Sequence, residues 1–260
     1  MKGIGIIIDV LAIILGGSIG VMLKYEFPAW LKRLALQVVG LAAILFGAHS
    51  LIDGWFSGDK PDIELEGSFL IVIALILGAI FGEALRFDRG MDKLATSLRR
   101  IDRRSAATKN NDTTNAIELR SGNAFVDGFT TASILCAFGA MTFTSTLAEC
   151  LDGDQKAMLI KAAVDAVVIF LLVKVYGSGA IFAALPTLVV EGILAFIATQ
   201  LPAWLTLAYI GHLIVISSVI LIAEGINLAF GKRLRVINLI PAFFIGPLYW
   251  WAIKSVDLKK

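Results

Sequence analysis

The sequence predicts an all-α polytopic membrane protein that forms one transmembrane domain over residues 1–260. The chain is 58% hydrophobic and 17% charged, with a mean hydropathy of +0.83, whereas a soluble domain is about half apolar and a quarter charged. Its longest apolar runs approach the roughly 20 residues that cross a bilayer as a helix. An open sheet is excluded because lipid cannot satisfy the backbone groups at its edges. The loops between the apolar runs also alternate between basic and acidic.

About eight transmembrane helices are expected. They are placed over residues 4–23, 33–52, 68–87, 123–148, 157–175, 178–199, 204–228 and 236–254. The fourth is the longest and most polar, and Gly139 within it favours a broken helix. A seven-span alternative stays open because the C-terminal tail is basic.

The charges of the loops indicate the orientation. Residues 86–120 contain nine basic and five acidic side chains, a net charge of +4. Residues 53–66 contain five acidic side chains and one lysine, and residues 149–156 are acidic as well. Basic loops face the cytoplasm. We therefore expect a multi-pass protein of the bacterial plasma (inner) membrane with both termini outside.

The basic cytoplasmic loop, residues 88–120, is predicted to begin as an interfacial helix. Met91, Leu94, Leu98 and Ile101 recur at helical spacing, and basic residues surround them. Such a helix can lie among lipid headgroups and attract anionic lipid. A solvated connector is the alternative.

A short motif occurs twice, as Phe27–Leu31 (FPAWL) and as Leu201–Leu205 (LPAWL), each time just before a long apolar helix. In the expected topology the two copies lie on opposite sides of the membrane. Inverted repeats of this kind are the architecture of many secondary transporters. The alternative is a generic interfacial turn, in which proline starts a helix and tryptophan lies at the headgroups.

Polar residues of four successive spans are expected in one layer of the membrane. Asp165, Glu191 and His212 each lie about eight residues from the same end of their helices, or about 12 Å deep. The fourth span adds hydroxyl groups and a glycine close to this depth. These residues are Thr142, Thr144, Ser145 and Gly139. Because ionisable groups in hydrocarbon are costly, the layer predicts a site for a cation, a proton or a polar solute.

Structural explanations of the same residues stay open. Lys161 and Asp165 have the i,i+4 spacing of an ion pair within one helix, in which Lys161 would extend outward to the interface. His212 can be a packing residue, and the hydroxyl groups can bond across a helix interface. The amide of Asn238 can stabilise an irregular last span or line the path. Four other acidic residues lie near span ends and are weaker candidates: Asp9, Glu83, Asp127 and Glu224.

The order of several motifs resembles the YdfK/YqgA-type family of uncharacterised bacterial integral membrane proteins. These motifs are Leu15–Gly20, Ala132–Thr142 with its Phe-Gly-x-Met element, Lys161–Asp165, Glu191-Gly192, and Arg235–Ala242 with Asn-Leu-x-Pro-Ala. The resemblance covers essentially the whole chain and implies a multi-span plasma-membrane protein. It also implies a glutamine before Gly192, where this chain has Glu191.

The expected function is that of a secondary transporter or channel for a small polar solute or cation, with intramembrane carboxylates as binding or coupling groups. The alternative is a non-transporting membrane protein whose basic loop docks a partner or anionic lipid. An enzyme is disfavoured because no nucleophile–base pattern is found, and no metal site, cofactor or nucleic-acid partner is expected.

Cys136 and Cys150 are expected to be packing residues. The glycine pairs Gly16/Gly20 and Gly78/Gly82 can pack helices within one chain or in an oligomer.

Overall fold

The computed structural model describes residues 3–23, 25–56, 65–106, 124–200, 203–231 and 234–245, and within them the regular structure is helical, without strands. The α-helices are α1 (Ile4–Met22), α2 (Ala29–Phe56), α3 (Leu65–Ala84), α4 (Phe87–Ala106), α5 (Ala124–Ala137), α6 (Ala140–Leu147), α7 (Lys156–Tyr176), α8 (Ala184–Gln200) and α9 (Ala203–Phe230). A π-helical turn, Ala148–Asp152, follows α6, and 3-10 segments lie at Ser178–Ala183 and Val236–Leu239. The predicted all-α class is confirmed.

The number of membrane spans is confirmed only in part. In the described ranges, four helical segments are long and apolar enough to cross a bilayer, and the bent α5–α6 pair makes a fifth. The four are Ile4–Met22, Ala29–Gly54, Ser178–Gln200 and Gly211–Phe230. The apolar part of α3, Ile71–Ala84, is shorter, and most of the predicted last span lies outside the described residues. The predicted count of eight is therefore not confirmed.

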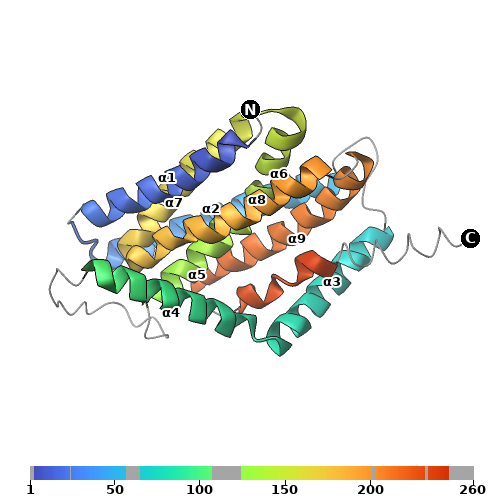
Figure 1. Cartoon of the computed structure of the whole chain (residues 1–260). Helices are drawn as coiled ribbons and strands as arrows, with labels where there is room; N and C mark the ends of the chain where they lie inside the picture. The colour runs from blue at the N-terminus through green and yellow to red at the C-terminus, as the bar shows by residue number, and fades with distance from the viewer. Residues whose placement is uncertain are drawn as a thin grey trace, which may run out of the picture.

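Two long helix pairs make the most extensive helix contacts of the bundle: α1 with α7, along its upper side in Figure 1, and α2 with α9 below them. α1 runs parallel to α7, as shown by two contacts: Gly5 lies against Met158, and Gly20 lies against Val173. α2 packs along α9 in the opposite direction, since Gly40 meets Gly225 and Gly54 meets Ile214. Both glycine pairs noted in the sequence serve packing within the chain: Gly16 and Gly20 against α7, Gly78 and Gly82 against the segment 238–242.

The contact between α2 and α9 is reciprocal. A methyl group added at Gly40 would lie 2.7 Å from the carbonyl oxygen of Gly225, and one added at Gly225 would lie 2.6 Å from that of Gly40. Both helices have 28 residues, and each begins at the alanine of its Pro-Ala-Trp motif. The two motifs therefore lie at opposite ends of one antiparallel helix pair.

The distribution of polar and apolar side chains suits a lipid environment. Large apolar residues are exposed along one side of α1, with Ile7 and Leu15 about 60% exposed. Charged residues, by contrast, are buried in the interior, among them Asp9 at 0% and Lys161 at 2% exposure. Such a surface is expected where the outside of a protein meets lipid tails rather than water.

α4 lies across one end of the bundle (Figure 1). Ala95 on α4 is fully buried against Val126 and Phe129 of α5, while Leu94 remains exposed beside Lys93. The predicted helix is thus confirmed, and its contact with headgroups stays a prediction. We call this end of the bundle the basic end. The opposite end, where residues 148–155 connect α6 to α7, is called the acidic end.

The predicted break in the fourth span is present. α5 ends at Ala137, α6 begins at Ala140, and the two axes differ by 41°. Gly139 precedes α6 in an extended conformation, and the hydroxyl of Thr142 donates a hydrogen bond to the carbonyl of Cys136 at 2.7 Å. The break leaves the Cys136 carbonyl without a helical hydrogen bond, and the Thr142 hydroxyl replaces it, since buried polar groups need partners.

Candidate functional site

Four charged side chains meet inside the bundle, and Lys161 is at their centre. The Lys161 Nζ atom lies 2.6 Å from Asp9 Oδ2, 2.7 Å from Asp165 Oδ2 and 2.9 Å from Glu191 Oε1. All four residues are at most 7% exposed. We call these four residues the charge cluster.

Three helices bring the charge cluster together. Lys161 and Asp165 are one turn apart on the same face of α7, as their i,i+4 spacing predicts. Asp9 comes from α1, which runs parallel to α7, and Glu191 comes from α8. The glycines of α1 permit this approach, since the Cβ of any other residue at Gly16 would collide with the backbone of Ala166. Small residues are the usual means of close helix contact in membranes.

The hydrogen bonding of the three carboxyl groups is unequal. Asp9 and Asp165 each accept a hydrogen bond from Lys161 through Oδ2. Glu191 is within ion-pair distance, but within the described part of the chain neither of its oxygens has a hydrogen-bond partner, and Asp9 Oδ1 also lacks one. Glu191 therefore has the least well-directed contact of the three, although its Oε1 atom is only 2.9 Å from the ammonium.

The charges do not balance within the cluster. Three ionised carboxylates and one ammonium give a net charge of −2, and excess charge in a low-dielectric interior is strongly unfavourable. Two carboxylates close together resist simultaneous ionisation and favour an added proton or cation. The arrangement can therefore take up and release positive charge, which is the property that a coupling site needs.

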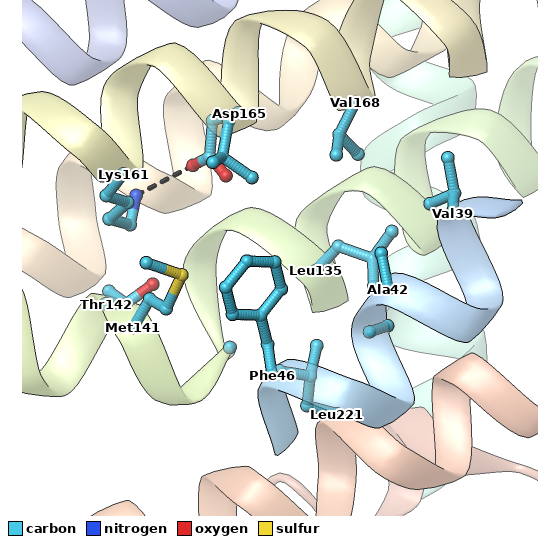
Figure 2. A pocket seen from close by; sticks show the side chains of 13 residues that line it. Val39, Ala42, Phe46, Leu135, Met141, Thr142, Lys161, Asp165, Val168 and Leu221 are labelled. Atoms are coloured by element: carbon cyan, nitrogen blue, oxygen red, sulfur yellow. Dashed lines mark hydrogen bonds and ion pairs between the residues drawn. The ribbon is translucent and has the colours of Figure 1, made fainter. Parts of the chain in front are cut away.

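A small cavity borders the cluster where the fourth span is broken. Its volume is about 60 Å³, and it is lined by Lys161 and Asp165 together with Gly139 and Thr142. Figure 2 shows Lys161 and Asp165 pointing toward each other on one wall, with apolar side chains such as Phe46 and Leu221 on the other. The lining is mostly apolar, so a water molecule or small solute inside would find its polar partners at Lys161, Asp165 and Thr142.

The predicted site residues fall into two groups. Asp165 and Glu191 meet at Lys161, and Gly139 and Thr142 line the adjoining cavity. The hydroxyls of Thr144 and Ser145 bond to the carbonyl of Met141 on their own helix, and that of Ser145 also lies 3.6 Å from the sulfur of Met158. These two hydroxyls are not among the groups that line the cavity.

The structure brings neither His212, which was expected in the layer, nor Asn238, which was expected to stabilise an irregular last span or line the path, to the charge cluster. His212 precedes the cavity residue Leu221 by nine residues of α9, or about 13 Å of rise. The Asn238 amide donates to Glu83 Oε2 at 2.6 Å and accepts from the backbone N–H of Asp88 at 3.2 Å. Arg235 pairs with the other oxygen of Glu83. Asn238 thus connects α3, α4 and the last described segment at the basic end.

Three buried charged residues were missed or misjudged from the sequence. Asp9 was given little weight because it is near the start of its helix, and Lys161 was expected to extend outward, yet both are buried at the centre of the cluster. Glu149 was assigned to an acidic loop, but it is 1% exposed and lies on the π-helical turn. For Asp9, the sequence feature that pointed to burial was the run of small residues in α1, which indicated that a neighbouring helix approaches closely.

The structure provides no direct support for a metal centre or a disulfide. No group of three or more His, Cys, Asp or Glu side chains is arranged to hold a metal ion in the described ranges. Lys161 occupies the space between the three carboxyl groups of the cluster. Cys136 and Cys150 are both buried, and neither forms a disulfide.

Comparison with known proteins places the chain. Residues 4–251 match the family described as "Protein of unknown function (DUF554)". The chain is 20% identical to the "Uncharacterized membrane protein YdfK" of Bacillus subtilis over 98% of this chain and 99% of that protein. It is 21% identical to the "Uncharacterized protein YqgA" of Escherichia coli over 94% of each chain. No solved structure matches. With its apolar helices and a membrane protein among its relatives, the chain is a membrane protein that belongs to the DUF554 family.

Proposed function

We propose that this protein is a secondary transporter or channel of the bacterial plasma membrane that moves a small polar solute or cation. The charge cluster is its coupling site, and Glu191 is the carboxyl group that exchanges a proton. The supporting observation is the burial of three carboxyl groups around a single ammonium, beside a small cavity that Lys161 and Asp165 help to line. A purely structural ion pair needs one carboxylate for each lysine, and this cluster holds two more.

Glu191 is proposed as the proton-exchanging group because its protonation disrupts the fewest hydrogen bonds from Lys161. Protonating Asp9 or Asp165 would weaken a hydrogen bond from Lys161, whereas Glu191 accepts none from the described residues. In this proposal Lys161 is a tethered cation, and a proton on Glu191 changes how tightly Lys161 is held by the other two carboxylates. A solute entering the cavity would meet Lys161 and Asp165 in either of two charge states.

The antiparallel packing of α2 on α9 supports a transporter architecture. Helices of equal length, each starting at a Pro-Ala-Trp motif and packed antiparallel, are what an inverted repeat would produce. α3 also packs in the opposite direction to the segment 238–242, since Gly78 meets Ala242 and Gly82 meets Asn238. The helix order α1–α2–α3 would then correspond to α8–α9 and the last segment. The two halves would move against each other around a site near their interface.

The proposal is tested by the protonation state of the cluster and by ion movement. Infrared spectra of the purified protein should contain the band of a buried protonated carboxyl group at neutral pH, and Glu191→Gln should remove it. Asp152→Asn, which alters an exposed carboxylate at the acidic end, is the matched control. In proteoliposomes, a pH step should drive charge movement that Glu191→Gln abolishes and Asp152→Asn retains. A parent protein without the band and without proton-dependent charge movement would count against a coupling site.

The alternative function, docking of anionic lipid or a partner by the basic loop, rests on α4. Its exposed Leu94 and Lys93 lie together on the surface that faces away from α5. Charge reversal at Lys93 should weaken binding to anionic vesicles without changing the infrared band. The two proposals therefore make separate predictions, and the charge cluster has no part in the second.

A further inference from the structure

Glu149 is a fourth buried carboxyl group near the charge cluster, and the function proposed above gives it no part. It is 1% exposed and belongs to the π-helical turn Ala148–Asp152 at the acidic end of the bundle. Its Oε1 atom accepts a hydrogen bond of 2.7 Å from the backbone N–H of Gly5, in the first turn of α1. The partial positive charge of a helix N-terminus favours a carboxylate at this position.

The second oxygen of Glu149 is available. Within the described residues, Oε2 is buried and has no hydrogen-bond partner. The carboxyl group lies against Gly5, where an added Cβ would be 2.5 Å from Oε2 and 2.6 Å from Cγ of Met158. The glycine thus provides the space that the carboxyl group occupies. A buried carboxylate oxygen without a partner is costly, so Oε2 is a position that a proton or a water molecule would occupy.

Glu149 is in register with the charge cluster. Gly5 and Asp9 are four residues apart on α1, and Met158 and Lys161 are three apart on α7, so each pair shares a helix face. Glu149 therefore lies one helical turn, about 6 Å, from the cluster on its acidic side. Asp9 Oδ1, the next carboxyl oxygen inward, is also buried and without a hydrogen-bond partner among the described residues.

We propose that Glu149 is the proton relay between the acidic-end surface and the charge cluster, with Asp9 as the receiving group. This inference rests on the proposed function of the cluster. A proton from solution binds Glu149 Oε2, then leaves it for a bridging water while that water gives a proton to Asp9 Oδ1. Glu149 returns to its ionised form, and Asp9, neutral only in passing, gives the proton on to Glu191, whose protonated form the infrared band reports. A water is needed because a helical turn is longer than a hydrogen bond.

The relay carries protons rather than metal cations. A bound Na⁺, Mg²⁺ or Ca²⁺ needs several oxygen ligands around it. Glu149 offers one free oxygen, because Oε1 is held by Gly5, and Lys161 fills the space between the cluster carboxylates. A proton needs one lone pair, which Oε2 provides. Glu149 therefore has enough free oxygen atoms to bind a proton but too few to bind a metal cation.

The test follows protonation of the cluster from one side of the membrane. Proteoliposomes carrying Asp152→Cys allow the exposed acidic end to be labelled with a membrane-impermeant thiol reagent, so that the orientation is known; the two natural cysteines are buried. The vesicles start at an alkaline pH at which the protonated carboxyl band is absent, and after an acid step on the acidic-end side stopped-flow infrared spectroscopy follows the rise of that band. Glu149→Gln keeps an oxygen acceptor for the Gly5 amide but cannot carry the proton.

The expected result is a rise about 100-fold slower in Glu149→Gln after an acid step at the acidic end, the low end of the effect of a positioned proton-transfer group. In Glu149→Gln the final amplitude of the band should equal that of the parent, and so should the rate of its rise after an acid step at the basic end. Gly5→Ala, which retains the carboxyl group but displaces it, should slow the same step. An unchanged rate in Glu149→Gln, with a band present in the parent, would overturn the relay alone. Absence of any proton-dependent band in the parent would overturn both the relay and the coupling site.

Discussion

The ammonium of Lys161 lies 2.6 Å from the carboxylate of Asp9, a residue 152 positions earlier in the chain. This pair joins α1 to α7 in the interior, where Asp9 is 0% and Lys161 2% exposed. Neither residue can be removed without leaving a charged partner buried. The stability of the protein should therefore depend on the charge of the cluster in ways that pH can reveal.

Replacing Lys161 with Met should destabilise the protein at neutral pH by about 3–5 kcal/mol, the usual cost of breaking a buried ion pair by removing one partner. The loss should diminish as the pH falls. Without Lys161 the buried carboxyl groups must hold protons when folded, so the folded state binds more protons than the unfolded state at neutral pH. Stability then decreases as pH rises and increases as pH falls. Thermal unfolding in detergent from pH 8 to pH 5 measures the trend.

The control for this experiment is Lys156→Met at the exposed start of α7. It removes the same charge from the same helix without uncovering a buried carboxylate, so its stability should follow the parent at every pH. A Lys161→Met variant as stable as the parent at pH 8 would show that Lys161 does not neutralise the cluster.

The three carboxyl groups should differ when each is neutralised. Asp9→Asn replaces a charged acceptor of Lys161 with a neutral one and should cost about 1–3 kcal/mol of unfolding free energy. Glu191→Gln removes an excess charge and, among the described contacts, no hydrogen bond, so it should leave stability unchanged or raise it. Thermal unfolding of both variants at pH 7.5 makes the comparison. Equal destabilisation by the two changes would indicate that Glu191 is a structural partner rather than an exchangeable group.

The depth of a charged residue within a membrane helix could be predicted from the sequence, but its neighbours could not. Asp165 and Glu191 were placed in one layer because depth depends only on distance from a helix end, and both contact Lys161. Asp9 was set aside because, five residues into α1, it could reach headgroups. It does not, because α1 lies along α7 and covers it. That contact depends on which helices are adjacent, which the sequence of one helix does not specify.

The same distinction explains His212 and Gly139. The break at Gly139 follows from local chemistry, since a glycine among hydroxyl residues weakens a helix, and the structure contains it. His212 was assigned to the layer by its distance from the start of its helix, and α9 begins at Ala203, within one residue of the expected start. α9 instead brings Leu221 to the cavity, and His212 lies two to three turns closer to the acidic end. Equal depth from a helix end therefore does not bring a side chain to the cluster, because the packing of α9 against the other helices also decides which of its residues lie there.

Thr142→Val should destabilise the protein through the broken fourth span. The Thr142 hydroxyl donates to the carbonyl of Cys136 across the break, and its loss leaves a buried carbonyl unsatisfied at a cost of about 1–3 kcal/mol. Thr199→Val is the matched control, since its hydroxyl donates to Phe196 on the exposed surface of α8. The two variants are compared by thermal unfolding. If Thr199→Val were the more harmful change, the hydroxyl at the break would have no special structural role.

Gly40→Ala should separate α2 from α9. The added methyl group would lie 2.7 Å from backbone atoms of Gly225 and Ala229, which cannot rotate away as a side chain can, so the helices must move apart. Overpacking of this kind typically costs about 1–3 kcal/mol. Gly192→Ala on α8 is the control: no described atom lies within 4 Å of its added methyl group, and alanine favours a helix over glycine by about 1 kcal/mol. The unfolding temperature of Gly40→Ala should therefore be lower than that of the parent, and that of Gly192→Ala should be equal or higher.

Because Gly225→Ala makes the reciprocal collision, it should behave like Gly40→Ala. A stable Gly40→Ala variant would mean that the antiparallel α2–α9 contact is looser than 2.7 Å, and the inverted-repeat architecture would lose its main structural support.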